Sequence, residues 1–208
     1  MKDRCPNGDF SDSYYDRKCG EDPKKEKKSD QTHGSAEYSE EEMDIFEWAL
    51  KNGLTSMTTL EAFDGKRALK RSEMAKIISI FSTKFMDKKE EKNPDCENFE
   101  DIKNITSDLH DYMIEACNLG IMGRTSDGKG VMKNFRPLDE VTKAEAVTIV
   151  SRVFRNHQYH NVNGEKRYEG HLKHLIEIGA LEDKKNIDNP FSRNHFYQLF
   201  KKIYTLDL

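Results

Sequence analysis

The chain contains no long apolar run, and its apolar content is low overall. Of its 208 residues, 35% are hydrophobic and 35% are charged, whereas globular proteins average about 25% charged residues. No window approaches the roughly 18 apolar residues that a membrane-spanning helix requires, so we expect no membrane span. The 11 Phe and 8 Tyr residues still provide aromatic surface for a packed core, which excludes a chain that is disordered throughout.

The chain also lacks an excess of basic residues. Its 34 Lys and Arg residues are outnumbered by 38 Asp and Glu residues, which gives a net charge of −4. Nucleic-acid-binding domains carry a basic surface, so we expect no nucleic-acid partner. The sequence contains no nucleophile elbow, phosphate-binding loop or paired-carboxylate motif. We therefore expect no enzymatic activity and no catalytic residue.

Four cysteines are present, and none has the Cys-x-x-Cys spacing of a zinc site. Four cysteines allow three pairings. Local pairing, Cys5 with Cys19 and Cys96 with Cys117, is the simplest; four free thiols in a cytosolic protein are the alternative. Disulfides would indicate an extracellular location. The first residues, MKDRCPNG, contain no apolar signal segment, so either a leader has been removed or the inferred compartment is wrong.

The N-terminal part has too little apolar content to form a core. Residues 1–20 form a polar loop bracketed by cysteines, and residues 21–38 form a polar linker. Residues 9–16, DFSDSYYD, place oxygen ligands at alternating positions, but they lack the glycine and the terminal glutamate of a calcium loop. His171 and His174 lie three residues apart with no acidic or cysteine residue to complete a zinc site. We therefore expect no metal or other cofactor, with calcium at residues 9–16 as the alternative.

A helix–loop–helix pattern then occurs three times, in residues 39–92, 93–156 and 157–208. Apolar residues recur with a helical period on both sides of each loop. Thr142 and Glu145 form the sequence pattern of a capping box. The predicted helices cover residues 42–52 and 70–85, residues 107–119 and 142–154, and residues from 168 to the glycine at 179 and from 192 to 203. A single unit of this size cannot bury its apolar face alone, so we predict an all-α fold in which three units share one core.

The three units align on two features of their sequences. The first helix of each unit ends at a glycine, namely Gly53, Gly120 and Gly179. The second helix begins with RSEM at 71–74, KAEA at 143–146 and RNHF at 193–196. The unequal spacing of these features indicates loops of different length between matched helices.

These features resemble the S-layer homology domain, which attaches bacterial surface proteins to cell-wall polysaccharide. The second unit is the most similar, and the first has Ser72 where the family has alanine. The third unit is degenerate: it keeps the helix stop and Arg193 but has Asn194 and His195 in place of Ala-Glu. The similar segments are FEDI at 99–102, ACNLGIMG at 116–123 and NFRPLDEVTKAEAVTIVSRV at 134–153, and WALKNGLTSM at 48–57 and EAFDGKRALKRSEMAKII at 61–78.

The resemblance implies a pseudo-three-fold spindle with a central three-helix bundle and grooves between its prongs. Such grooves bind anionic, pyruvylated-type secondary cell-wall polysaccharide at the cell surface or in the S-layer. The family's basic residue at the helix start corresponds to Arg71, Lys143 and Arg193, which we expect to bind the polysaccharide. Glu73 and Glu145 would then act as supporting caps that orient the adjacent cation. Without the resemblance, the three basic residues would be interpreted as ordinary surface charges.

A second function is compatible with the same sequence. The chain contains little besides its repeats, so an anchor would have no large domain to display. The alternative is therefore a self-assembling surface-layer or extracellular filament subunit, in which the repeats make contacts between subunits.

Overall fold

A computed structural model describes residues 38–105, 107–125, 129–156, 166 and 168–206 of the chain. Within these residues the fold is all-α, as predicted: seven α-helices, one 3-10 helix and no strand. The N-terminal loop, its predicted Cys5–Cys19 disulfide, the candidate calcium loop and nearly all of the linker lie outside the described residues. The helices are α1 (Glu40–Lys51), α2 (Leu60–Phe63), α3 (Arg71–Phe85), η1 (Pro94–Glu97), α4 (Ser107–Asn118), α5 (Lys143–Arg155), α6 (Glu169–Glu177) and α7 (Arg193–Leu206).

The six long helices occur where the apolar periodicity predicts them, and the first helix of each unit ends at its predicted glycine. Gly53, Gly120 and Gly179 have φ values of 69°, 73° and 73°, a left-handed conformation that glycine adopts without steric cost. The residue after each glycine donates its N–H to the carbonyl five residues earlier, at 2.8–3.1 Å. The two short helices α2 and η1 lie in segments that the sequence predicts as loops. None of the helices in the described residues has the length and apolar character needed to cross a membrane.

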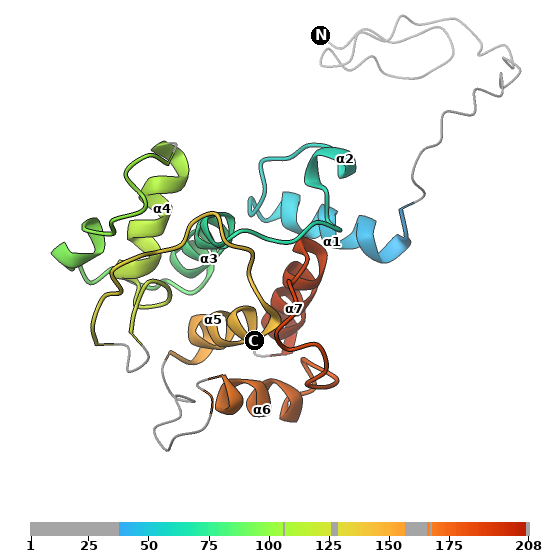
Figure 1. Ribbon diagram of the computed structural model, residues 1–208. Helices are drawn as coiled ribbons and strands as arrows, with labels where there is room; N and C mark the ends of the chain where they lie inside the picture. Colours follow the sequence, from blue (N-terminus) through green and yellow to red (C-terminus); the bar gives the residue numbers. More distant parts are fainter. Residues whose placement is uncertain (1–37, 106, 126–128, 157–165, 167, 207–208) are drawn as a thin grey trace, which may run out of the picture. The chain divides into compact units, whose positions relative to one another are not determined.

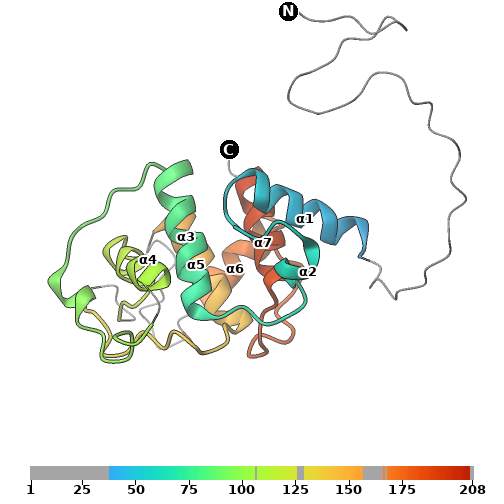
Figure 2. The same cartoon turned by 90° about the horizontal axis from the view of Figure 1, so that it is seen from above.

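Each shorter helix packs against a longer helix from the unit before it. Helix α4 packs against α3, α6 packs against α5, and α1 packs against α7 from the far end of the chain. Figures 1 and 2 show α4 and α1 on opposite sides of the longer helices. The helices that pack together are therefore not the two helices of one sequence unit.

Three extended segments before the longer helices are joined in a closed ring of backbone hydrogen bonds. Leu69 N–H donates to Phe191 O at 3.0 Å, Phe191 N–H donates to Val141 O at 2.7 Å, and Val141 N–H donates to Leu69 O at 2.8 Å. A second set of three bonds joins the same segments in the opposite direction around the ring. In it, the N–H groups of Arg71, Lys143 and Arg193 donate to the carbonyls of Asp139, Asn189 and Arg67 at 2.9–3.0 Å. Each long helix thus starts from a segment held by the other two units.

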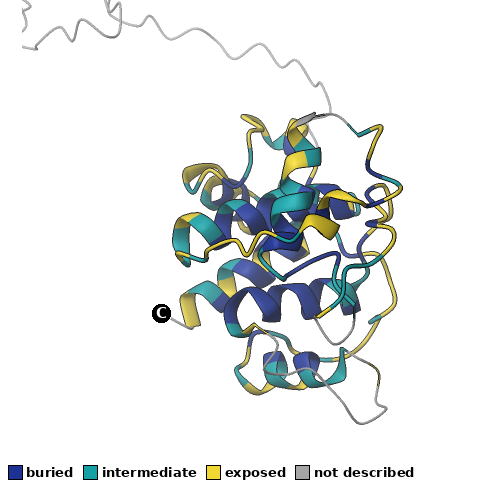
Figure 3. Cartoon of the chain, turned by 90° about the vertical axis from the view of Figure 1, so that its left-hand side faces the viewer, coloured by how far each residue is buried: buried dark blue, intermediate teal, exposed yellow. Residues whose placement is uncertain are grey.

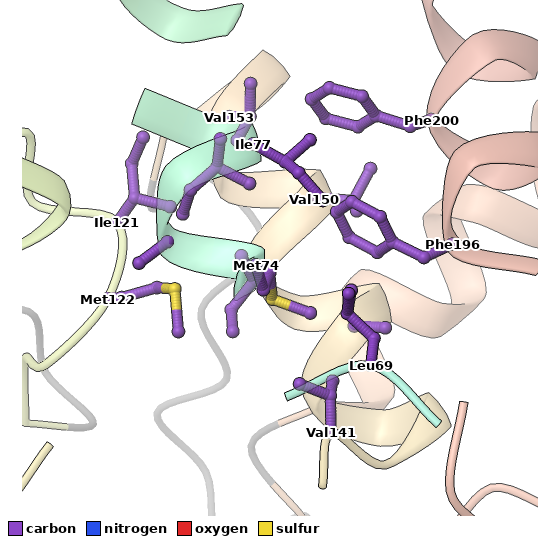
Figure 4. Packing of buried hydrophobic residues seen from close by; sticks show 14 of the residues in the cluster. Leu69, Met74, Ile77, Ile121, Met122, Val141, Val150, Val153, Phe196 and Phe200 are labelled. Atoms are coloured by element: carbon purple, nitrogen blue, oxygen red, sulfur yellow. The ribbon is translucent and has the colours of Figure 1, made fainter. Parts of the chain in front are cut away.

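The three longer helices share one apolar core (Figures 3 and 4). The ring of Phe81 on α3 meets the ring of Phe200 on α7 edge to face, with centroids 4.5 Å apart. Six core side chains from these three helices are at most 5% exposed. They are Met74 and Ile77 of α3, Val150 and Val153 of α5, and Phe196 and Phe200 of α7.

The predicted disulfide between Cys96 and Cys117 is present and joins η1 to the end of α4. Both cysteines are fully buried. The neighbouring Asn118 reinforces the same connection, because its backbone carbonyl accepts the N–H of Glu91 at 3.1 Å and its side-chain oxygen accepts the N–H of Asn93 at 3.1 Å. These bonds satisfy acceptors at the helix end that have no partner within the helix. They also fix the loop between α3 and α4.

Asn194, which is larger than Ser72 and Ala144 at the equivalent positions of the other units, is accommodated by a glycine in the first unit. The N–H of Asn194 donates to Gly65 O at 2.8 Å. At the equivalent contacts the smaller residues Ser72 and Ala144 face Pro137 and Ile187. A Cβ atom on Gly65 would lie 1.9 Å from Oδ1 of Asn194. The larger residue on α7 therefore requires the absence of a side chain at position 65.

We expect Gly65→Ala to lower the free energy of unfolding by about 1–3 kcal/mol, the usual cost of overpacking. Asn194→Ala should restore most of this loss in the double variant, because it removes the atoms in conflict. A double-mutant cycle by urea denaturation measures the coupling. Additive effects of the two substitutions would contradict the proposed contact.

Candidate functional site

Two grooves lie at equivalent places, beside the starts of α5 and α7. The Arg71 groove has a cavity volume of about 810 Å³ and lies between the turn at 121–124, the loop at 136–142, the first half of α5 and Tyr168. The Lys143 groove has a volume of about 590 Å³ and lies between the turn at 180–183, the loop at 185–190 and the first half of α7. Two of the three predicted binding residues therefore line grooves. Arg193 is not among the residues that line either one.

The guanidinium group of Arg71 is held by residues of the second unit. Its Nε donates to the carbonyl of Phe135 at 2.9 Å, and its Nη1 donates to Oε1 of Glu145 at 3.0 Å. The guanidinium also lies over the Phe135 ring, 5.6 Å from its centroid. With a side chain only 6% exposed, Arg71 forms the inner wall of its groove and contributes little surface to the opening.

Arg193 has an equivalent environment, built from residues of the first unit. Its guanidinium donates to the carbonyl of Phe63 and to Oε1 of Glu73, the latter at 2.9 Å, and it lies 5.5 Å from the centroid of the Phe63 ring. Arg67 binds the same Glu73 carboxylate through both of its terminal nitrogens. Each of the two carboxylates thus binds one buried arginine from another unit and one more exposed arginine from the preceding loop.

Glu73 remains ionised because its hydrogen bonds outweigh its burial. Burial alone would raise the pKa of this carboxyl, but the bonds from Arg67 and from the backbone N–H of Lys70 hold the pKa below its ordinary value of 4.5. The Lys70 N–H lies 3.0 Å from Oε2 of Glu73. The negative charge that holds Arg193 in place is therefore present at neutral pH.

Lys143 has a different set of partners. Its Nζ donates to the carbonyls of Asp183 and Lys185 at 3.1 and 3.0 Å, and it lies 3.6 Å from the Asp183 carboxylate. His195 occupies the position equivalent to Glu73 and Glu145, where its ring contacts the Ser192 hydroxyl at 2.8 Å. Lys143 is a lysine where the other two units have arginine, and His195 stands where they have glutamate; both residues line the same groove. The cation of this groove is therefore not bound by a glutamate at the helix start.

Glu73 and Glu145 are both located at helix starts, where they were predicted to act as caps. Oε2 of Glu145 accepts the N–H of Thr142 at 3.2 Å, and the Thr142 hydroxyl accepts the N–H of Glu145 at 3.2 Å. We expected each glutamate to orient the adjacent basic residue, but each one binds the basic residue at the start of another helix. Glu145 binds Arg71 and Glu73 binds Arg193, because the start of each helix faces the next unit.

Arg67 and Arg136 also belong to these clusters, and neither was among the predicted site residues. They occupy different positions in their loops: Arg67 pairs with Asp64 three residues earlier, whereas Arg136 pairs with Asp139 three residues later. The order of acid and base is thus reversed, yet each arginine reaches the glutamate of the following helix start. The sequence did contain a signal for these two residues, because each is an arginine a few positions before the start of a long helix.

Metal ligands do not gather in the part of the chain that the structure describes: it contains no group of three or more His, Cys, Asp and Glu residues. His171 is fully buried, and its Nδ1 lies 2.9 Å from the hydroxyl of Ser151. This histidine therefore contributes to the contact between α5 and α6.

Comparison with known proteins does not assign the chain to a class. No protein-family model matches the sequence. No curated protein matches it either. The fold and the grooves define a helical protein with charge-lined surface grooves.

Proposed function

We propose that the chain anchors a protein non-covalently to the bacterial cell envelope by binding an anionic, pyruvylated-type polysaccharide. The observation that carries this proposal is the charge of the Arg71 groove. Its lining has five basic and three acidic residues, although the whole chain is acidic. The basic residues are Arg71, Arg124, Arg136, Arg152 and Lys166, and the acidic residues are Asp139, Glu140 and Glu145.

The chemistry of such a groove suits an acidic sugar. A guanidinium group can bind a carboxylate through two parallel hydrogen bonds, and a sugar acid of a wall polysaccharide would present that group. Tyr168 lies in the same groove and offers an apolar ring for the face of a sugar. A neutral glycan would gain nothing from the excess of basic residues.

The proposed architecture is a pseudo-three-fold spindle with α3, α5 and α7 as its central bundle. The cyclic order of the backbone hydrogen bonds supports it, as does the packing of each shorter helix on the longer helix of another unit. Grooves would then recur between units, with the Arg71 and Lys143 grooves as two of them. The Cys96–Cys117 disulfide supports an oxidising, extracellular location.

Sedimentation of the full chain with purified acidic wall polysaccharide tests this function. We expect binding to the native polysaccharide and none after mild acid has removed its pyruvate ketals, with affinity falling as salt increases. Binding to both preparations, or to neither, would contradict the proposal. Ordered polymers that form without any glycan would favour the self-assembling subunit.

Arg193 provides the matched control for substitution of Arg71. Both side chains are 6% exposed, and each lies over a phenylalanine ring and binds a glutamate. Arg71→Ala and Arg193→Ala should therefore disturb folding to a similar extent. We expect Arg71→Ala to weaken polysaccharide binding more, because only Arg71 lines one of the two grooves. Equal losses would show that the effect comes from folding alone.

A further inference from the structure

Arg136 occupies a backbone position that disfavours arginine. Its φ is 61°, and the equivalent residues of the other units, Asp64 and Asn186, have φ values of 44° and 55°. Aspartate and asparagine adopt this left-handed conformation more readily than other non-glycine residues. Arginine offers no such advantage, so its presence in the second unit has a cost in backbone strain.

The turn that carries Arg136 is braced by a residue of the preceding loop. The Asp101 carboxylate accepts the N–H of Phe135 at 2.9 Å and the N–H of Arg136 at 2.7 Å. A strained residue persists where the surrounding structure determines its conformation, and such residues gather at functional sites. Asp101 therefore fixes the direction in which the Arg136 side chain leaves the backbone.

That direction brings Arg136 to the rim of the Arg71 groove. Its guanidinium binds Glu145 and lies 3.6 Å from the Asp139 carboxylate. The Arg136 side chain is 42% exposed, whereas that of Arg71, on the same glutamate, is 6% exposed. Of the two arginines that bind Glu145, Arg136 is therefore the one that a ligand in the groove can reach.

We propose that Arg136 is the ligand-contacting cation of the Arg71 groove and that it binds the carboxylate of a pyruvate ketal on a sugar ring. Arg71 holds Glu145, and Glu145 positions Arg136 beside the groove. Arg124 and Lys166 line the same cavity and add positive charge for a ligand of this class. This inference rests on the proposed function and identifies the residue that makes the contact.

Arg136→Asn tests the contact, because asparagine is the residue at the equivalent position 186. The probe is a methyl hexopyranoside that carries a 4,6-pyruvate ketal, and its neutral methyl ester is the control ligand. We expect calorimetry to show at least a tenfold loss of affinity for the acid, with an unfolding temperature that stays the same or rises. Arg67→Asn is the matched control, since Arg67 binds Glu73 in the same manner but does not line the groove. It should bind the probe like the unsubstituted chain.

The possible results distinguish a failure of the Arg136 contact from a failure of the proposed anchor function. Probe affinity unchanged in Arg136→Asn would overturn the role of Arg136 and leave the anchor function intact. A loss of binding matched by a lowered unfolding temperature would assign Arg136 a structural role and overturn the inference as well. An unsubstituted chain that binds the polysaccharide but not the ketal would overturn the ligand class. A chain that binds neither would overturn the function and the inference together.

Discussion

Replacing Glu145 with alanine should lower the free energy of unfolding by about 3 kcal/mol, at the lower end of the cost of breaking a buried ion pair. The substitution removes the Glu145 carboxylate from the nearly buried guanidinium of Arg71. It also removes the carboxylate that caps α5 through the N–H of Thr142. Urea denaturation of the full chain, followed by circular dichroism, measures the change.

The three units provide matched controls for this experiment. Glu73→Ala should cost a similar amount, because it leaves Arg193 in the same situation. His195→Ala, at the equivalent position of the third unit, should change the free energy of unfolding by no more than about 0.5 kcal/mol, the range of ordinary surface substitutions. Lys143 keeps its bonds to Asp183 and Lys185 in that variant. A cost at His195 as large as that at Glu145 would contradict the role assigned to the glutamates.

Loss of the Cys96–Cys117 disulfide should destabilise the fold by about 3 kcal/mol, the amount that chain entropy gives for a closed loop of this length. The two cysteines are 21 residues apart in sequence, so their bond restricts a sizeable part of the unfolded chain. Cys96→Ala with Cys117→Ala removes the bond without leaving a buried thiol. The urea midpoint of this double variant should lie well below that of the intact chain.

The other two cysteines must be held constant in this comparison. Both chains should carry Cys5→Ala and Cys19→Ala, so that only one cysteine pair differs. Added reductant should then lower the midpoint of the chain that retains Cys96 and Cys117, and it should leave the double variant unchanged. A difference below about 1 kcal/mol would show that hydrogen bonds such as those of Asn118 fix the loop without the disulfide.

The helices could be predicted from the sequence because their signals are local. Apolar residues recur every three or four positions, and glycine ends each first helix. The capping box at Thr142 marks the start of α5 to within one residue. Helix α2 was missed because its four residues are too few to show a period. The cysteine pairing could also be predicted for residues 96 and 117, since their separation is short.

The clusters at the helix starts could not be predicted, because their partners are far apart in sequence. Arg71 and Glu145 are 74 residues apart, and Arg193 and Glu73 are 120 apart. The repeat alignment compares equivalent positions but does not indicate which units touch. The alignment therefore could not show that Lys143 of the second unit and His195 of the third line one groove.

The contact between Asn194 and Gly65 could not be predicted from the sequence either. The residue departs from the repeat pattern, and the sequence offered no reason for it. The compensating residue, Gly65, belongs to another unit and also departs from its equivalents, Pro137 and Ile187. Only the fold shows that one departure makes room for the other.

The ring of backbone hydrogen bonds formed by Leu69, Val141 and Phe191 limits how many repeats can join it. In an open repeat protein each unit touches only its neighbours in sequence, so units can be added or removed at the ends. Here the third unit bonds back to the first, and every N–H in the ring already has its acceptor. A fourth copy would find no place in the ring, and two copies would leave it open. The hydrogen bonds of this ring therefore constrain the number of such segments, and they do not constrain the length of the loops between them.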